Sequence, residues 1–126
     1  MNLKATLFML SAFNVVVGAV FWLIPGETAK YLGITTEASP PGYLFSIAGA
    51  AFIASAVLFS FTAYAPLANL NGVRFAILWN ALMLIAAISS VAQGYVDWGH
   101  IWFIVALNAI FFLALAIFYP WKPRSA

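Results

Sequence analysis

Residues 101–119 read IWFIVALNAIFFLALAIFY, a stretch without a charged side chain that ends at Pro120. A helix needs about 20 apolar residues to cross a hydrocarbon core roughly 30 Å thick, and this stretch has nearly that length. Because it is apolar around its whole circumference, it would be stable as a helix only where lipid or protein surrounds it. The stretch therefore predicts a membrane-spanning helix.

Three more charge-free stretches of similar length precede it. They cover residues 5–24, 43–64 and 75–93. Proline and glycine, which commonly end helices, stand at or near the ends of the spans: Pro25, Pro40, Gly42, Pro66, Gly94 and Pro120. The pair Asn71–Gly72 predicts a turn before the third span. The sequence thus predicts an all-α membrane protein, a four-transmembrane-helix bundle that forms a single integral membrane domain over residues 1–126.

The composition of the whole chain supports a membrane environment. Hydrophobic residues make up 66% of the 126 residues and charged residues only 6%, whereas a soluble domain has roughly 25% charged residues. A chain with so few charges cannot cover a water-facing surface, so lipid is predicted to be its main solvent. Its basic residues are scattered, which argues against nucleic acid as a partner. The lack of cysteine excludes thiolate catalysis.

The basic residues also predict the orientation of the chain. One side of the predicted spans carries Lys4, Arg74, Lys122 and Arg124, and the other side carries only Lys30. Because cytoplasmic loops carry an excess of lysine and arginine, both the N-terminus and the C-terminus are predicted to be cytoplasmic.

Single cysteines can test this orientation, because the natural chain contains none. Thr35→Cys lies between the first two spans and is expected to react with a membrane-impermeant thiol reagent added to intact cells. Ser125→Cys lies near the C-terminus and should stay unlabelled until the cells are permeabilised. The opposite labelling pattern would invert the topology.

The longest connection between spans, residues 25–42, predicts a short helix that lies flat at the outer interface. Residues 26–33 could form two turns that end at Gly33, where a left-handed cap is easy. Glu27 and Lys30 would face water. The residues predicted to face the membrane are Tyr31, Leu32 and Ile34.

Titratable groups are almost absent from the spans. None of the spans contains Asp, Glu, Lys, Arg or His at depth, whereas proton-coupled transporters normally need such a group.

The only acid–base pair in reach is Asp97 with His100, at i and i+3 near a predicted helix start. The two form a candidate polar pair at the interface. Asp97 is interpreted first as a favourable charge near that helix N-terminus. His100 is interpreted first as a solvated residue, with donation to lipid headgroups or ligation of a haem or chlorophyll metal as alternatives. Candidate bases are too few for a triad or paired carboxylates, so no catalytic residue and no metal site is predicted.

Asparagines on three different spans form the main candidate site: Asn14, Asn80 and Asn108. Counting at about 1.5 Å per residue places them at a similar depth, in one polar layer. The layer could bind a polar group of a ligand. The favoured interpretation is that it holds the helices together, since amides bond across membrane helices for about 0.6 kcal/mol each. Both interpretations predict side chains that point into the bundle and contact another helix, directly or through water. The favoured one predicts that leucine at one position lowers thermal stability modestly.

The second span carries a small face and a bulky face. Ala48, Ala51 and Ser55 predict that a neighbouring backbone approaches closely. The bulky face consists of Phe45, Phe52 and Phe59. Such a stripe would meet lipid, fill a groove between helices, or contact a pigment or quinone.

The stretch GAVFWLIP at residues 18–25, followed by Leu32-Gly33-Ile34, resembles small four-helix bacterial membrane proteins of the DoxX-like type. In those proteins a first helix ends at a proline, a short leucine–glycine segment follows, and a glycine-containing second helix comes next, here around Gly49. The resemblance implies a bacterial inner-membrane protein that serves as an accessory subunit beside quinone-linked redox enzymes. It carries over no catalytic residue.

Two functions are compatible with these residues. The first, which the sequence favours, is a non-enzymatic accessory or structural subunit that packs against larger membrane partners or against copies of itself. The second is a binder or carrier of a lipophilic small molecule, such as a quinone, isoprenoid or lipid, held between its helices. An integral membrane enzyme is disfavoured because acids and bases are so few. No cofactor is predicted, a bound lipid or quinone is compatible with the pattern, and the lipid bilayer is the expected partner.

Overall fold

The computed structural model describes residues 2–33 and 42–121, and within these ranges the regular elements are all helices. In chain order they are α1 (Leu3–Leu23), α2 (Pro25–Tyr31), α3 (Gly42–Tyr64), α4 (Leu70–Ala92) and α5 (Trp98–Phe118). Four of them, all except α2, are long and apolar enough to cross a membrane. The all-helical fold and the short helix after the first long one are therefore as predicted.

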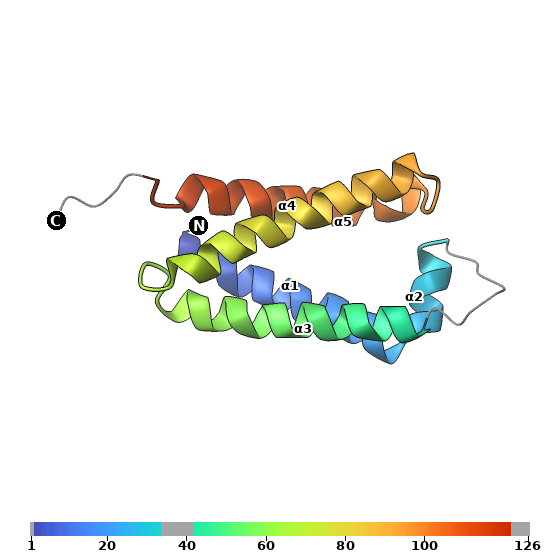
Figure 1. Cartoon of the computed structure of the whole chain (residues 1–126), viewed down its shortest axis with the longest axis horizontal. Helices are drawn as coiled ribbons and strands as arrows, with labels where there is room; N and C mark the ends of the chain where they lie inside the picture. The colour runs from blue at the N-terminus through green and yellow to red at the C-terminus, as the bar shows by residue number, and fades with distance from the viewer. Residues whose placement is uncertain (1, 34–41, 122–126) are drawn as a thin grey trace.

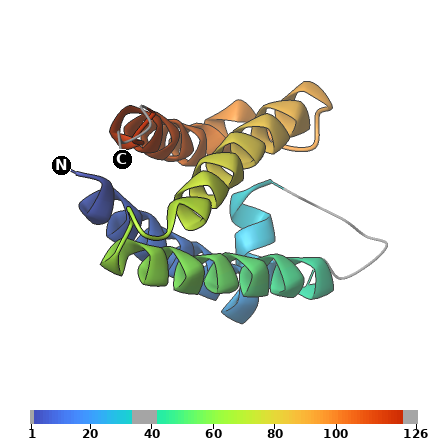
Figure 2. The same ribbon diagram turned by 60° about the vertical axis from the view of Figure 1, so that its left-hand side comes forward.

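The four long helices are arranged as two pairs, α1 with α3 and α4 with α5 (Figure 1). The pairs meet at the end of the molecule that holds the start of α1, the turn at residues 65–69 and the end of α5, which we call the termini end (Figure 1). They move apart toward α2, and we call that end the α2 end (Figures 1 and 2). In Figure 1, α2 stands across the long helices in the space between the two pairs.

The buried apolar core lies at the termini end. Its members come from the start of α1, the end of α3, the start of α4 and the end of α5: Leu3, Leu7, Leu10, Phe59, Ala63, Val73, Ala76, Phe111 and Leu115. Along α4, by contrast, no residue from 81 to 92 is buried. The two pairs are thus packed together at one end and separated at the other.

Two facing glycines bring α1 and α3 into contact. A Cβ atom on Gly49 would lie 2.6 Å from the backbone oxygen of Gly18, and a Cβ atom on Gly18 would lie 2.8 Å from that of Gly49. Toward the termini end, the Ser11 hydroxyl donates to the Ala56 carbonyl at 2.7 Å. Ala51, predicted to lie on the contact face, is exposed, because the helices approach where a side chain is missing altogether.

Helix α4 begins earlier than the predicted third span. It starts at Leu70, so the pair Asn71–Gly72 lies inside its first turn and the turn predicted there is wrong. The chain turns instead at residues 65–69. A Cβ atom at position 72 would collide with the Thr62 side chain of α3. Close packing against α3 therefore explains a glycine that the sequence alone suggests for a turn.

The short helix α2 has the predicted cap and the predicted charged face. Gly33, just beyond its end, adopts a positive φ of 73°. Glu27 and Lys30 are exposed and form an ion pair at 3.5 Å. Tyr31 is also exposed.

The Leu32 side chain, next to α2, points into the molecule and not toward the membrane as predicted. Leu32 is only 8% exposed and lines the space between the helix pairs, so its predicted position facing the membrane is wrong. The separation of the two pairs leaves apolar surface that Leu32 covers. Ile34, predicted to accompany it, lies outside the described residues.

Candidate functional site

A cavity of about 270 Å³ lies between the two helix pairs toward the α2 end. All four long helices and the segment after α2 contribute to its wall. Three aromatic rings line it, from Phe13, Phe21 and Phe52, and the remaining lining is aliphatic except for Ser90 and Asn108. The cavity is therefore an apolar space with two polar side chains in its wall.

The cavity exists because the helices diverge and because α4 faces it with small side chains. Ala86, Ala87 and Ser90 lie on the cavity side of α4, and none of them is long enough to reach the α1–α3 pair. Leu32 covers part of the cavity at the α2 end. Since Ala86 is exposed, the cavity also reaches the surface of the molecule.

The phenylalanine stripe of α3 faces the other helices. Phe45 lies against Phe21 of α1, with ring centroids 5.2 Å apart. Phe52 lies against Phe21 at 5.7 Å and against Trp79 of α4 at 5.2 Å. Phe59 is fully buried in the core. Of the surroundings predicted for this stripe, the groove between helices is the one observed.

The three asparagines lie at the boundary between the core and the cavity. Asn14 and Asn80 are 0% exposed and Asn108 is 6% exposed. On each of the three helices, a core residue lies one helical turn from the asparagine toward the termini end. A residue that lines the cavity lies one turn from it toward the α2 end. These flanking residues are Leu10 and Val17 on α1, Ala76 and Met83 on α4, and Phe111 and Ile104 on α5. The amides thus separate the packed end from the hollow end.

Each of these amides bonds to its own helix. The Nδ2 atoms of Asn14 and Asn80 donate to the carbonyl four residues earlier at 2.8 Å, and that of Asn108 does so at 2.9 Å. All three side chains point into the bundle, as predicted, but among the described residues none of them forms a direct hydrogen bond to another helix. The helix's own carbonyls lie within reach of these short side chains and accept the bond instead.

Two amide oxygens are left without a partner. The Oδ1 atoms of Asn14 and Asn80 are buried and accept no hydrogen bond within the described part of the chain. A buried acceptor without a donor costs about 1–3 kcal/mol. Such groups are rare in folded proteins and call for a functional or structural reason.

Asp97 and His100 are not joined by a side-chain hydrogen bond in the described chain. Asp97 is the N-cap residue of α5, where a negative charge meets the positive end of the helix dipole. Its carbonyl accepts the backbone N–H of His100 at 3.0 Å. The exposed imidazole lies over Gly33, where an added Cβ atom would be 3.5 Å from its Cε1 and Nδ1 atoms. His100 thus contacts the segment that follows α2.

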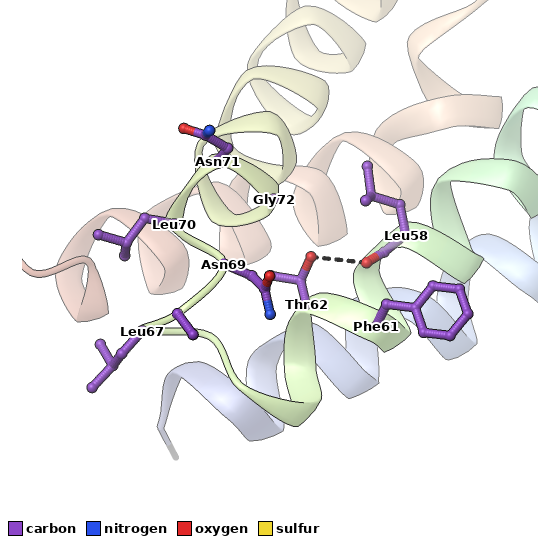
Figure 3. A pocket seen from close by; sticks show the side chains of 9 residues that line it. Leu58, Phe61, Thr62, Leu67, Asn69, Leu70, Asn71 and Gly72 are labelled. Carbon is purple, nitrogen blue, oxygen red and sulfur yellow. Dashed lines mark hydrogen bonds between the residues drawn. The ribbon is translucent and has the colours of Figure 1, made fainter.

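A second cavity, of about 330 Å³, lies at the termini end beside the turn between α3 and α4 (Figure 3). The Thr62 hydroxyl in its wall donates to the Leu58 carbonyl at 2.8 Å. The Asn69 amide donates to the Ala65 carbonyl at 3.0 Å. Only the end of α3, the turn and the start of α4 line this second cavity, whereas all four long helices line the cavity between the helix pairs, which is therefore the stronger candidate.

Within residues 2–33 and 42–121, no group of three His, Cys, Asp or Glu side chains is placed to hold a metal ion. In comparisons with known proteins, no family model, no curated protein and no solved structure matches the chain. The resemblance to the DoxX-like type therefore stays a prediction.

Sequence reasoning identified the asparagines but missed most of the cavity wall. Ala86, Ala87 and Ser90 carry no distinctive chemistry, and their role depends on what lies opposite. The available signal was their spacing, which continues the face of α4 that carries Asn80 and Met83. The pattern that could have indicated a cavity is a set of small side chains on the helix face that carries a buried amide, within a helix whose other side chains are mostly large.

Proposed function

We propose that this chain is an integral membrane protein that binds a lipophilic small molecule in the cavity between its helix pairs. The observation that carries the proposal is an apolar, ring-lined cavity that ends at a layer of buried amides. Four helices have the length and composition of membrane spans. Large apolar side chains are exposed along all four of them, and an exposed apolar surface of this extent indicates an apolar surrounding.

The cavity favours a ligand that is largely apolar and carries few polar groups. Its volume of about 270 Å³ is close to the lower end of small-molecule sites, roughly 300–1,000 Å³, so it suits a ring or part of a chain. Rings of Phe13, Phe21 and Phe52 offer edge and face contacts to an unsaturated group. The amide of Asn108 can bond to a carbonyl or hydroxyl of the ligand. Quinones, isoprenoids and lipids belong to this class.

The same proposal includes the bacterial inner membrane with both termini in the cytoplasm. The start of α1 and the end of α5 lie at the same end of the molecule (Figure 1), as an even number of spans requires. The alternative function, an accessory subunit beside larger membrane proteins, stays a prediction, because lipid covers exposed apolar helices as well as a partner would.

Filling the cavity is expected to remove the ligand. Ala87→Phe places a ring in the cavity, so we expect the purified variant to lose a lipophile that the natural chain retains at about one per protein. Solvent extraction followed by mass spectrometry, with protein quantified in the same sample, measures this ratio. The matched control is Ala51→Phe, the same change at an exposed position of α3, which should keep the ligand.

The result separates the two functions. An empty natural chain, or equal ligand loss in Ala87→Phe and Ala51→Phe, would contradict binding in this cavity. A protein of fixed stoichiometry that co-purifies with the empty chain would favour the accessory subunit. Circular dichroism of both variants establishes that the helices are intact.

A further inference from the structure

A groove of about 300 Å³ lies between α4 and the segment that follows α5, at the termini end, and is lined at one end by the cationic side chain of Arg74. The Nε atom of Arg74 donates to the Tyr119 hydroxyl oxygen at 2.7 Å. The Nη1 atom of Arg74 donates to Asn71 Oδ1 at 3.2 Å. These bonds tie the guanidinium to both helices, so its position is set by the fold.

This guanidinium keeps free donors and an unbalanced charge. Its planar fork carries more N–H groups than these two bonds use. No carboxylate pairs with Arg74 in the described part of the chain, where the ion pair is that of Lys30 with Glu27. Glu27 and Asp97 belong to the α2 end, since they lie in α2 and at the start of α5, and Glu37 lies outside the described residues.

Away from Arg74, the groove is apolar and is bordered by two aromatic rings. Ile77, Leu78 and Ala81 continue it along α4, and the distance along the helix from Arg74 to Ala81 is about 10 Å at 1.5 Å rise per residue. Tyr119 and Trp121 line its other side, with their ring centroids 4.7 Å apart. Tyrosine and tryptophan concentrate at the headgroup level of membranes. The groove thus combines an anion-binding end with a surface for hydrocarbon.

We propose that this groove binds an anionic phospholipid, with the headgroup phosphate on Arg74 and the first part of an acyl chain along Ile77, Leu78 and Ala81. This proposal rests on the proposed membrane location but not on a ligand in the cavity between the helix pairs. An arginine fork matches the geometry of phosphate oxygens. A zwitterionic lipid is less suitable because no carboxylate among the described residues lines the groove to meet its ammonium group, so the charge of Arg74 selects a lipid with net negative charge.

Native mass spectrometry of the purified chain with equal amounts of phosphatidylglycerol and phosphatidylcholine tests the proposal. The natural chain is expected to retain phosphatidylglycerol preferentially. Arg74→Gln should lower that preference about tenfold, the effect of losing one charge-assisted contact. The matched control is Lys4→Gln, which removes the same charge from an exposed position at the same end, outside the groove, and should keep the preference.

A second variant tests the site independently, in case Arg74→Gln does not fold. Tyr119→Phe keeps the ring but removes the hydroxyl that orients the guanidinium, and a reduced preference for phosphatidylglycerol in a variant with natural helix content would support the site. Added inorganic phosphate should not displace the lipid, and displacement by it would overturn the claim that a lipid is the occupant. Equal effects of Arg74→Gln and Lys4→Gln, or a natural chain with no preference, would overturn the proposal.

The two proposals fail in different ways. Flotation of the natural chain with phosphatidylcholine vesicles tests insertion into a bilayer, on which both depend. If the chain floats and its lipophile is retained in the cavity but phosphatidylglycerol is not preferred, only the groove proposal is overturned. If phosphatidylglycerol is preferred while the extracted cavity is empty, the groove proposal is supported and the proposed cavity function fails.

Discussion

Replacing Gly49 by alanine is expected to destabilise the folded protein by about 1–3 kcal/mol, the usual cost of overpacking a close contact. An added Cβ atom would lie 2.6 Å from the Gly18 oxygen and 3.0 Å from the Trp22 nitrogen. Both of these are backbone atoms of α1, so no side chain can rotate away to make room. The two helices would have to separate along the contact that holds the α1–α3 pair together.

Thermal unfolding in detergent, followed by circular dichroism, measures this effect. Gly99→Ala is the matched control, because nothing lies within 4 Å of a Cβ atom there and alanine is favoured over glycine in a helix by about 1 kcal/mol. Its melting temperature should stay the same or rise. Gly18→Ala should lower stability as Gly49→Ala does, and the double variant should cost less than the sum, because both changes separate the same two backbones. Equal melting temperatures for Gly49→Ala and Gly99→Ala would refute the close contact.

The helices themselves were predictable because a long charge-free stretch of sequence leaves few structural options. A backbone in hydrocarbon must satisfy its hydrogen bonds internally, so a charge-free stretch of sufficient length indicates a helix without further information. The ends were less predictable where one residue type has two uses. Glycine often marks a turn or the end of a helix, but Gly72 lies inside α4 and makes room for the Thr62 side chain. Only the position of α3 distinguishes a glycine needed for a turn from one needed for close packing.

The arrangement of the helices, and with it the cavity, could not be predicted from the sequence. The periodicity of each helix does not predict which helices pair. In particular, it does not predict that α4 packs along α5 and diverges from the α1–α3 pair toward the α2 end. Leu32 illustrates the consequence: an apolar residue beside an interfacial helix is expected to face lipid, and it faces the bundle because the separated pairs leave an apolar space. The asparagines were identifiable because an amide inside a span is unusual. Their partners were not, because the bond to the preceding turn competes with one across helices.

That competition changes the expected outcome of replacing Asn80. If its amide joined helices, Asn80→Leu would lower the stability. The amide instead bonds to Ala76 of its own helix, and its Oδ1 atom is buried without a partner. Leucine has methyl groups in place of the amide atoms, and its introduction removes an unsatisfied acceptor that costs about 1–3 kcal/mol. We therefore expect Asn80→Leu to stabilise the lipophile-free protein by up to about that amount.

Differential scanning calorimetry of the extracted protein, free of lipophile, measures this change. Asn14→Leu should act in the same direction as Asn80→Leu, since its Oδ1 atom is equally unpaired. Asn108→Leu is the contrasting variant: its side chain lines the cavity, so we expect it to lower ligand retention with little change in stability. A lower melting temperature for Asn80→Leu would mean that its oxygen has a partner after all. A rise would mean that the chain keeps buried amides at a cost in stability, and residues kept at such a cost are typical of functional sites, here at the inner limit of the cavity.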